Sequence, residues 1–197
     1  SLAIVERSLA ASSIQNRISK IEAVLQRNWN EGEEAESRVD VMSALSHYLS
    51  GYPKAPSLSP LKSAMYVITR SSGDSKSQNT STGEFESRIK GIVNNLNLTN
   101  VSGDRQIVKT QKGLDEPLIA KVYLLKNDNQ IPVSNIPVVF KYESGEGELD
   151  EEQTSGSDGT VQSTIHKISS YEEASHVIAV RLDYSRIRSN FNSDFVE

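Results

Sequence analysis

Cysteine is absent from the 197 residues of the chain. Its absence excludes disulfide bonds, thiol nucleophiles and thiolate metal sites, and it fits a reducing and an oxidising compartment equally well. Long hydrophobic runs are missing too, because no stretch approaches the roughly 18 apolar residues needed to cross a bilayer. The sequence starts at Ser1 inside a helical pattern, and its first residues lack the charged, apolar and small-residue regions of an export leader. We expect that a leader has been removed or that the sequence begins inside a longer one.

Positive charge and aromatic side chains are scarce. The 21 lysines and arginines are outnumbered by 26 aspartates and glutamates, for a net charge of -5. No basic field exists to displace counterions from a phosphate backbone, so nucleic acid is not an expected partner. With 36% hydrophobic and 6% aromatic residues, the chain has modest material for a core. Since domains cluster near roughly 100 to 150 residues, we interpret this length as two small domains.

The first half of the sequence has the period of amphipathic helices. Apolar side chains recur at steps of three and four in four segments, which predicts four helices in a small antiparallel bundle. These residues are Ile14, Ile18, Ile21 and Leu25; Val41, Leu45, Tyr48 and Tyr52; Leu61, Ala64, Met65 and Ile68; and Phe85, Ile89, Ile92 and Leu96.

The ends of the second predicted helix are marked by charge and by helix-breaking residues. Gly51 and Pro53 predict where it stops. Glu33, Glu34 and Glu36 are expected near its start, where acidic groups suit the positive end of the helix dipole.

The third and fourth helices are predicted to begin at hydroxyl residues. Ser59 and Pro60 supply an N-cap and a first-turn residue with a preset φ. Ser81 or Thr82 is placed to cap the fourth helix. Between these helices, residues 71–83 are small and polar, so they bury too little apolar surface to offset the entropy of ordering. We expect a mobile loop there.

After Asn95 the apolar period changes to two, which indicates β-strands. Turn-forming residues at 127–129, 144–147 and 157–159 separate the runs. We interpret 144–147 as a hairpin turn, because it lacks the third glycine and the following helix of a dinucleotide site. Several short strands at this spacing are typical of a β-sandwich. The alternating residues are Leu118, Ala120, Val122 and Leu124; Val138, Phe140 and Tyr142; Val161, Ser163 and Ile165; and Ile178, Val180 and Leu182.

The order of residues from Val101 to Ile165 resembles that of bacterial immunoglobulin-like domains of the invasin and intimin type. The matching elements are Ser102-Gly103-Asp104-Arg105-Gln106, the Leu118 strand, Pro132-Val133, Ile136-Pro137-Val138-Val139-Phe140, Gly145, Gly147 and Ser157-Asp158-Gly159-Thr160-Val161. The resemblance implies that Pro132 lies in an inter-strand turn, that Phe140 packs in the core, and that Asp158 turns the chain into the next strand. These are scaffold roles.

The sequence departs from that family in a lengthened polar connection at 126–130 and in its helical first half. This layout resembles, more weakly, a bacterial envelope lipoprotein with a helical region before one such domain. We therefore predict an α+β fold, with a helical bundle at 1–93, an immunoglobulin-like antiparallel β-sandwich at 94–185 and a C-terminal tail at 186–197.

We predict no catalytic, cofactor-binding or metal-binding residues. None of the histidines, His47, His166 and His176, has another His, Asp or Glu at the spacing of a helical metal pair. No G-x-S-x-G motif is present for a serine hydrolase. We expect His47 and His166 on the solvated surface. Trp29 is interpreted as following the first helix, where it closes the bundle or docks a partner or a lipid interface.

Acidic residues are dense between Glu143 and Asp158. Oxygen-rich loops at the end of a sandwich hold calcium in some proteins, although this spacing matches no calcium-loop signature. Charges along an exposed strand also block edge-to-edge pairing. Both interpretations stay open, as does a carboxylate pair drawn from Glu148, Asp150 and Glu152.

These features favour a non-enzymatic, extracytoplasmic module of a bacterial envelope or surface, with the sandwich as a scaffold or presenting element. One alternative is an accessory subunit of an envelope or secretion complex that binds a protein partner through its helical region. Another is a glycan-acting hydrolase with a carboxylate pair. The expected partner is a protein or a cell-surface component, with a lipid anchor upstream as an option and no transmembrane segment in this chain.

Overall fold

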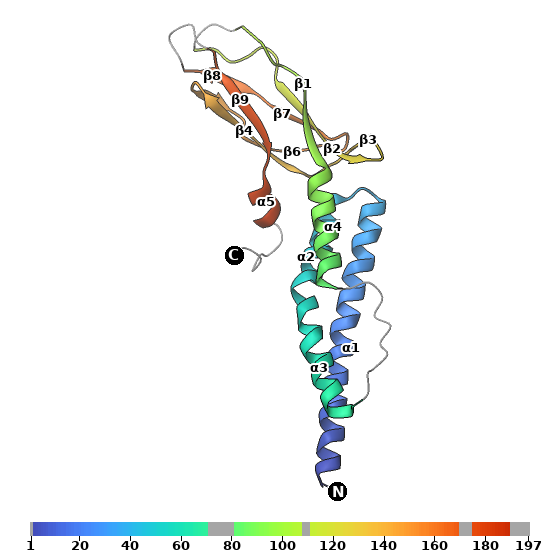
Figure 1. The fold of residues 1–197 in the computed structure, drawn as a ribbon. Coiled ribbons are helices and arrows are strands. Elements are labelled where there is room, and N and C mark those ends of the chain that lie inside the picture. The colour runs from blue at the N-terminus through green and yellow to red at the C-terminus, as the bar shows by residue number, and fades with distance from the viewer. Residues whose placement is uncertain (1, 71–80, 108–110, 170–174, 190–197) are drawn as a thin grey trace. The chain divides into compact units, whose positions relative to one another are not determined.

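A computed structural model describes residues 2–70, 81–107, 111–169 and 175–189, and the side chains of most of them. The chain divides into two units (Figure 1). The helical unit comprises residues 1–38 and 43–91, and the β unit comprises residues 92–196 together with 39–42. The structure is therefore α+β, with long helices followed by antiparallel sheets.

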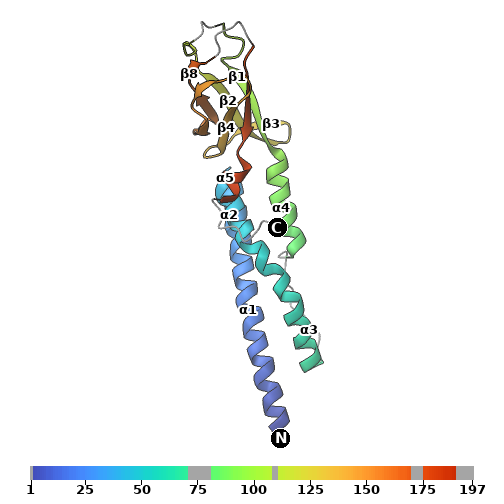
Figure 2. The same ribbon diagram turned by 90° about the vertical axis from the view of Figure 1, so that its left-hand side faces the viewer.

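Helix α1 (Leu2–Ser37) dominates the helical unit, and the later helices run along it. These are α2 (Val41–Gly51), the 3₁₀ helix η1 (Tyr52–Ser57), α3 (Leu58–Thr69) and α4 (Thr82–Asn95). Figures 1 and 2 show α2, η1 and α3 following one another in a single direction, opposite to that of α1. The predicted apolar residues of the four segments lie in these helices, except Leu96, which begins the strand that follows α4. The four predicted helices are present, but α2 and α3 do not run antiparallel to each other, because η1 carries the chain onward in the same direction.

Helix α1 continues about three turns beyond the predicted apolar pattern, and this corrects two expectations. Trp29 lies inside α1 and does not follow it. Glu33, Glu34 and Glu36 lie in the last turns of α1 and not at the start of α2, so they face the negative end of a helix dipole. Arg38 compensates in part, because its guanidinium lies 2.5 Å from the Glu34 carboxylate.

The predicted ends of the later helices are partly confirmed. Helix α2 ends at Gly51, and the chain tightens into η1, which contains two prolines. Helix α3 begins at Leu58 with Ser57 as its N-cap, so the predicted cap at Ser59 is wrong. The Ser57 hydroxyl makes no capping bond and donates instead to the Lys54 carbonyl oxygen (2.6 Å).

A reciprocal capping pair starts α4. The Ser81 hydroxyl accepts a hydrogen bond from the Glu84 backbone N–H (3.3 Å), and the Glu84 carboxylate accepts one from the Ser81 N–H (2.8 Å). The cap at Ser81 is therefore confirmed. Residues 71–80 of the expected loop lie outside the described residues, whereas Thr82 and Gly83 belong to α4.

The β unit begins with β1 (Leu96–Ser102), directly after α4, and contains two main sheets. In the first, β2 (Leu118–Lys126) pairs with β1 along one edge and with both β3 (Asn129–Pro132) and β7 (Thr160–Ser163) along the other. In the second, β4 (Pro137–Ser144) lies between β6 (Glu152–Thr154) and β9 (Val177–Leu182). A separate pair joins β5 (Gly147–Leu149) to β8 (Ile165–Ile168). Every pairing is antiparallel.

The predicted alternation along β2, β4 and β7 is confirmed by burial. Ala120 and Val122 on β2 and Val138 and Phe140 on β4 are at most 2% exposed, while Lys141, which follows Phe140 on β4, faces solvent. The interior thus takes side chains from both sheets.

Several strand-level expectations need correction. Strand β1 was not predicted, because Leu96 was assigned to the face of the preceding helix. Pro132 is the last residue of β3, paired with Tyr123, and does not lie in a turn. The predicted hairpin at 144–147 is wrong, since β4 and β5 belong to different sheets and do not pair. The expected tail at 186 is interrupted by α5 (Tyr184–Ser189), and residues 190–197 lie outside the described residues.

Two predicted turns are confirmed by backbone geometry. Asn127 and Asp128, with φ of 51° and 61°, join β2 to β3 as a two-residue turn with both central residues left-handed. Gly159, with φ of 79°, leads from the Asp158 turn into β7; a Cβ there would lie 2.4 Å from the Val122 carbonyl oxygen.

We expect Phe140→Ala to lower the free energy of unfolding of the β unit by about 3–5 kcal/mol, because the ring is fully buried and its removal leaves a cavity. NMR signals of β-strand residues, followed through a urea titration, would measure it. Lys141→Ala is the matched control on the exposed face and should change stability by less than about 0.5 kcal/mol. A larger loss of stability for Lys141→Ala than for Phe140→Ala would mean that the strand faces are inverted.

Candidate functional site

Three aromatic rings from three helices meet in the core of the helical unit. Trp29 of α1, Tyr48 of α2 and Phe85 of α4 have ring centroids 5.3–6.2 Å apart, and the rings are tilted or edge-to-face. Tyr48 and Phe85 are fully buried. Such contacts add to the apolar area that the rings bury, so the cluster holds α2 and α4 against α1.

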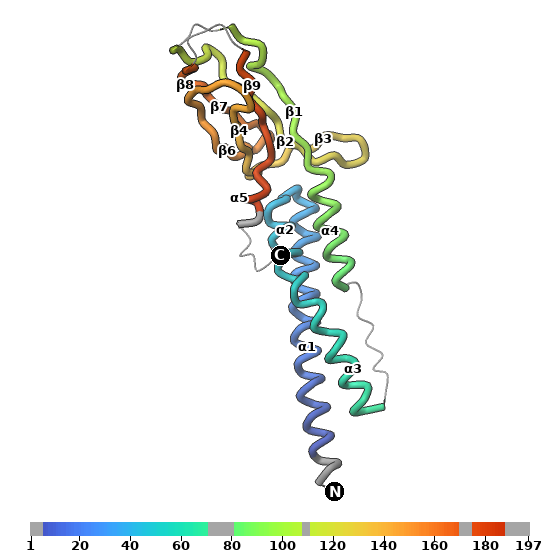
Figure 3. Tube along the Cα trace, turned by 60° about the vertical axis from the view of Figure 1, so that its left-hand side comes forward, coloured from blue at the N-terminus to red at the C-terminus, as the bar shows by residue number. Residues whose placement is uncertain are grey.

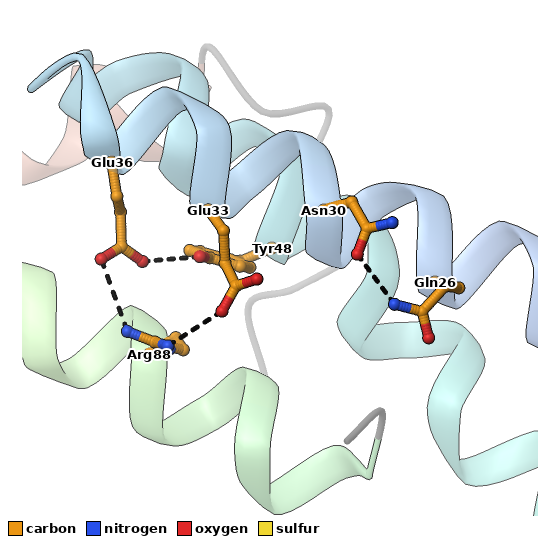
Figure 4. A network of polar contacts seen from close by, with 6 residues as sticks. All are labelled: Gln26, Asn30, Glu33, Glu36, Tyr48 and Arg88. Carbon is orange, nitrogen blue, oxygen red and sulfur yellow. Dashed lines mark hydrogen bonds and ion pairs between the residues drawn. The ribbon is translucent and has the colours of Figure 1, made fainter. Parts of the chain in front are cut away.

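A polar network covers the edge of this cluster (Figure 4). The Arg88 guanidinium of α4 lies 5.4 Å from the Trp29 ring centroid. It is also 3.1 Å from the Glu33 carboxylate and 3.6 Å from that of Glu36. The Tyr48 hydroxyl donates to the Glu36 carboxylate at 2.6 Å. Arg88 of α4 thus contacts a ring and two carboxylates of α1. Because Glu36 also binds Tyr48 of α2, the network joins the same three helices as the aromatic cluster.

The chemistry of this network is structural. Burial raises the pKa of the Tyr48 hydroxyl, and its hydrogen bond to Glu36 raises it further. The hydroxyl therefore stays protonated and keeps donating to the carboxylate. One turn away from the cluster on α1, the Gln26 side-chain amide donates to Asn30 at 2.8 Å (Figure 4).

Two glycines make room for the rings. A Cβ at Gly32 would lie 2.4 Å from the Tyr48 ring, and one at Gly51 would lie 2.5 Å from the Phe85 ring. Both distances are below any real carbon contact, so the rings reach their positions only because these helices lack a side chain there. Of the two readings of Trp29, the structure supports the one in which it packs within the bundle.

A pocket of about 1280 Å³ lies in the β unit. Its lining is mostly apolar and comes from both sheets, with Leu98 of β1, Ala120 of β2, Phe140 of β4 and both Ile178 and Val180 of β9. The polar part of the lining includes residues of the segment 103–106 and Tyr142 and His176. Pockets of this kind, mainly apolar with a few polar groups, are the usual form of a binding site.

The segment after β1, which borders this pocket, is held by the side chain of Gln106. Its amide nitrogen donates to the carbonyl oxygens of Gly103 (2.6 Å) and Glu116 (2.8 Å), and its amide oxygen accepts from the Glu116 N–H (3.2 Å). A Cβ at Gly103, where φ is 91°, would lie 2.2 Å from the Pro117 carbonyl oxygen. The Ser102–Gln106 stretch quoted for the family resemblance is therefore scaffold.

Tyr142 and His176 carry buried polar atoms, the hydroxyl and Nδ1 respectively, for which the described residues supply no hydrogen-bond partner. Both atoms are covered by the connection between β4 and β5. A Cβ at Gly145 would lie 2.0 Å from His176 Nδ1, and one at Gly147 would lie 2.4 Å from the Tyr142 hydroxyl. Burial raises the pKa of Tyr142. Because glycine backbone occludes both atoms, they do not offer hydrogen bonds to a molecule in the pocket.

The other two histidines each lie beside one carboxylate. His166 Nε2 is 2.9 Å from Asp150, and both side chains are exposed, as expected for His166. His47 Nδ1 is 3.1 Å from Glu31 on α1, and the imidazole is about one third exposed. The hydrogen bond from His166 lowers the pKa of Asp150. Each pair joins two neighbouring elements, and neither includes a third ligating residue.

The acidic residues of 143–158 do not converge. Glu143 pairs with Arg181, Glu152 with Arg186 and Asp150 with His166, each on a different strand or connection. Within the part of the chain that the structure describes, no three His, Cys, Asp or Glu side chains are grouped closely enough to hold a metal ion.

No protein-family model matches the chain, and neither a curated protein nor a solved structure matches it. Among the described helices, none has the length and apolar character that a membrane crossing requires.

We expect Gly32→Ala to lower the free energy of unfolding of the helical unit by about 1–3 kcal/mol, because the new methyl group clashes with the buried Tyr48 ring. Fluorescence of Trp29, the single tryptophan, measured through a urea titration would report it. In α4, Gly91→Ala is the matched control, since an added Cβ there has no atom within 4 Å. It should raise stability by about 0.5–1 kcal/mol through helix propensity. Stabilisation by both variants would contradict the packing described.

Acid should destabilise the β unit partly through Asp158. Its carboxylate accepts hydrogen bonds from the Thr160 hydroxyl (2.6 Å) and backbone N–H (3.0 Å), and these bonds lower its pKa. A folded-state pKa below the unfolded value gives stability that is complete above the usual aspartate range, about pH 4, and is lost as the pH falls through the folded pKa. Asp158→Asn should therefore show a smaller decrease in urea midpoint between pH 6 and pH 3. A decrease equal to that of the parent would contradict this role.

Proposed function

We propose that the protein is a non-enzymatic, extracytoplasmic module of a bacterial envelope or surface, in which an immunoglobulin-like β-sandwich presents or spaces the helical unit. The observation that carries the proposal is the pairing of the strands. Two antiparallel sheets, β1-β2 with β7 and β6-β4-β9, direct Ala120, Val122, Val138 and Phe140 into one interior. Inward side chains from two sheets are the basis of an immunoglobulin-like sandwich.

The residues that carry the family resemblance support the same proposal. Phe140 fills the interior, the Asp158 turn leads into β7, and Gly103 and Gly159 occupy backbone positions that a side chain would obstruct. These are the positions where the sequence resembles the invasin and intimin type of domain. The resemblance, and with it the envelope location, is what makes a scaffold or presenting role the best-supported one.

A second function, binding of a protein partner through the helical unit, is favoured by exposed apolar side chains. Leu9 on α1 is 67% exposed, and Tyr66 and Val67 on α3 are 59% and 74% exposed. Helix α1 is about 54 Å long at 1.5 Å per residue, and Figure 1 draws its N-terminal part beyond the end of α3. Exposed large apolar residues on a helix are typical of contact surfaces.

Epitope tagging of the complete gene in the bacterium that encodes the chain, followed by cell fractionation, tests the location. We expect the tagged protein in the envelope fraction and accessible to protease once the outer barrier is opened. Recovery in the cytosolic fraction would overturn the proposal. In the same strain, a photo-crosslinking residue at Val67 should capture a specific partner, with Lys90 on α4 as an exposed control position.

A further inference from the structure

The two edges of the β6-β4-β9 sheet differ in chemistry. Strand β6, at one edge, is Glu152-Gln153-Thr154, and its polar side chains protect it from adding another strand. Strand β9, at the other edge, is Val-Ile-Ala-Val-Arg-Leu, with Arg181 as its one polar residue. With no proline and a single charged residue, β9 has few of the features that normally block the addition of another strand at an edge. Among the described residues, however, β9 pairs with β4 alone.

Backbone groups of alternate β9 residues point away from the sheet. The Asp183 N–H donates to the Pro137 carbonyl oxygen, whereas the Phe140 N–H points the other way, to Glu151 beside β6. Because hydrogen-bonding groups alternate along an antiparallel strand, Ala179 and Arg181 face β4. The N–H and C=O groups of Ile178, Val180 and Leu182 therefore face the free edge, where no described residue accepts or donates.

The free edge of β9 lies on the open side of the unit. Strands β6 and β7, one from each main sheet, contact each other and close one side. Strand β1 is the edge strand on the side of β2 that lies away from β7. Strand β9 is the edge strand on the side of β4 that lies away from β6. The ribbon and tube views draw β1 and β9 side by side (Figures 1 to 3). Both strands line the 1280 Å³ pocket, through Leu98 and through Ile178 and Val180.

Side chains exposed near this opening are apolar. Val101 of β1 is 54% exposed and Val177 of β9 is 47% exposed. Ile178, Val180 and Leu182 lie opposite Tyr142, Phe140 and Val138 in the register, so they share the inward face of the sheet, yet they are only half-buried.

We propose that the open side between β1 and β9 binds an extended segment of a partner protein, which adds to β9 as a further strand. The occupant is about six residues long, to match β9, and has apolar side chains at alternate positions that enter the pocket. A lipid or a small apolar molecule would fill the pocket but leave the backbone groups of Ile178, Val180 and Leu182 unpaired. A peptide strand satisfies both. The proposal rests on strand pairing and does not depend on where in the cell the protein works.

The test supplies a probe strand to the full chain. A flexible linker of about 20 glycine and serine residues, followed by six residues in which threonine and isoleucine alternate, is added after Glu197. Tethering keeps the probe at a high effective concentration, so weak pairing is still detected. Amide hydrogen exchange by NMR should slow by at least about tenfold at Ile178, Val180 and Leu182. The amides of Ala179 and Arg181, which already face β4, should be protected with and without the probe.

Matched controls separate strand addition from other effects. A probe with each isoleucine replaced by aspartate should give no protection, since its side chains do not enter an apolar pocket. Val180→Pro removes one outward N–H without removing a bond to β4, and it should abolish the protection of Ile178 and Leu182. Val180→Ala shortens the same side chain but keeps the N–H, so it should retain most of the protection.

Three results would overturn the proposal. In the first, hydrogen exchange at the outward amides of β9 is no slower with the tethered probe, which would mean that the edge does not accept a strand. In the second, these amides are already protected without a probe at all protein concentrations, which would mean that another part of the chain covers the edge. Protection without a probe that increases with protein concentration would assign the edge to a second copy of the chain.

Discussion

The β unit depends on hydrogen bonding to two central strands, β2 and β4. Strand β2 holds β1 on one side and β3 and β7 on the other, and β4 holds β6 and β9. Each backbone group of a buried strand needs a partner, so this pairing decides which side chains face inward and which edges stay open. Phe140 and Val122 are buried because of it. The pocket and the free edge of β9 are consequences of the same arrangement, since contact between β6 and β7 closes the opposite side.

The helical unit depends on a different interaction, the packing of Trp29, Tyr48 and Phe85 against one another. Glycine at 32 and 51 lets the rings approach the helices, and Arg88 covers the cluster while pairing with two glutamates of α1. Exposed ion pairs by themselves stabilise a protein little. This one matters mainly because its cation also lies over the Trp29 ring and its acceptor Glu36 also binds the Tyr48 hydroxyl, so that three helices are joined at one place.

Glycine has a common role in both units, which is to let a large or polar side chain come close to backbone. Gly145 and Gly147 lie against His176 and Tyr142 in the way that Gly32 lies against Tyr48. The polar atoms of His176 and Tyr142 are enclosed as a result, so these two residues do not offer hydrogen bonds to a molecule in the pocket. The pocket lining is mainly apolar, with polar residues at its 103–106 border, and among the described residues the outward backbone groups of β9 have no strand partner. This combination suits a peptide better than a small polar ligand.

The sequence by itself determined the change from helix to strand near Asn95, the cap at Ser81, the turns at Asn127-Asp128 and Asp158-Gly159, and the inward position of Phe140. Each of these follows from local period, capping chemistry or the φ that a residue tolerates. The extent of α1 past Trp29, the existence of β1 and the separation of β4 from β5 were decided by tertiary structure. Only the packing of Tyr48 and Phe85 makes residues 26–37 helical beyond their weak apolar pattern, and only pairing with β2 makes Leu96–Ser102 a strand. The open edge of β9 was equally hidden, because a run of apolar residues looks the same in sequence whether or not a neighbouring strand is present.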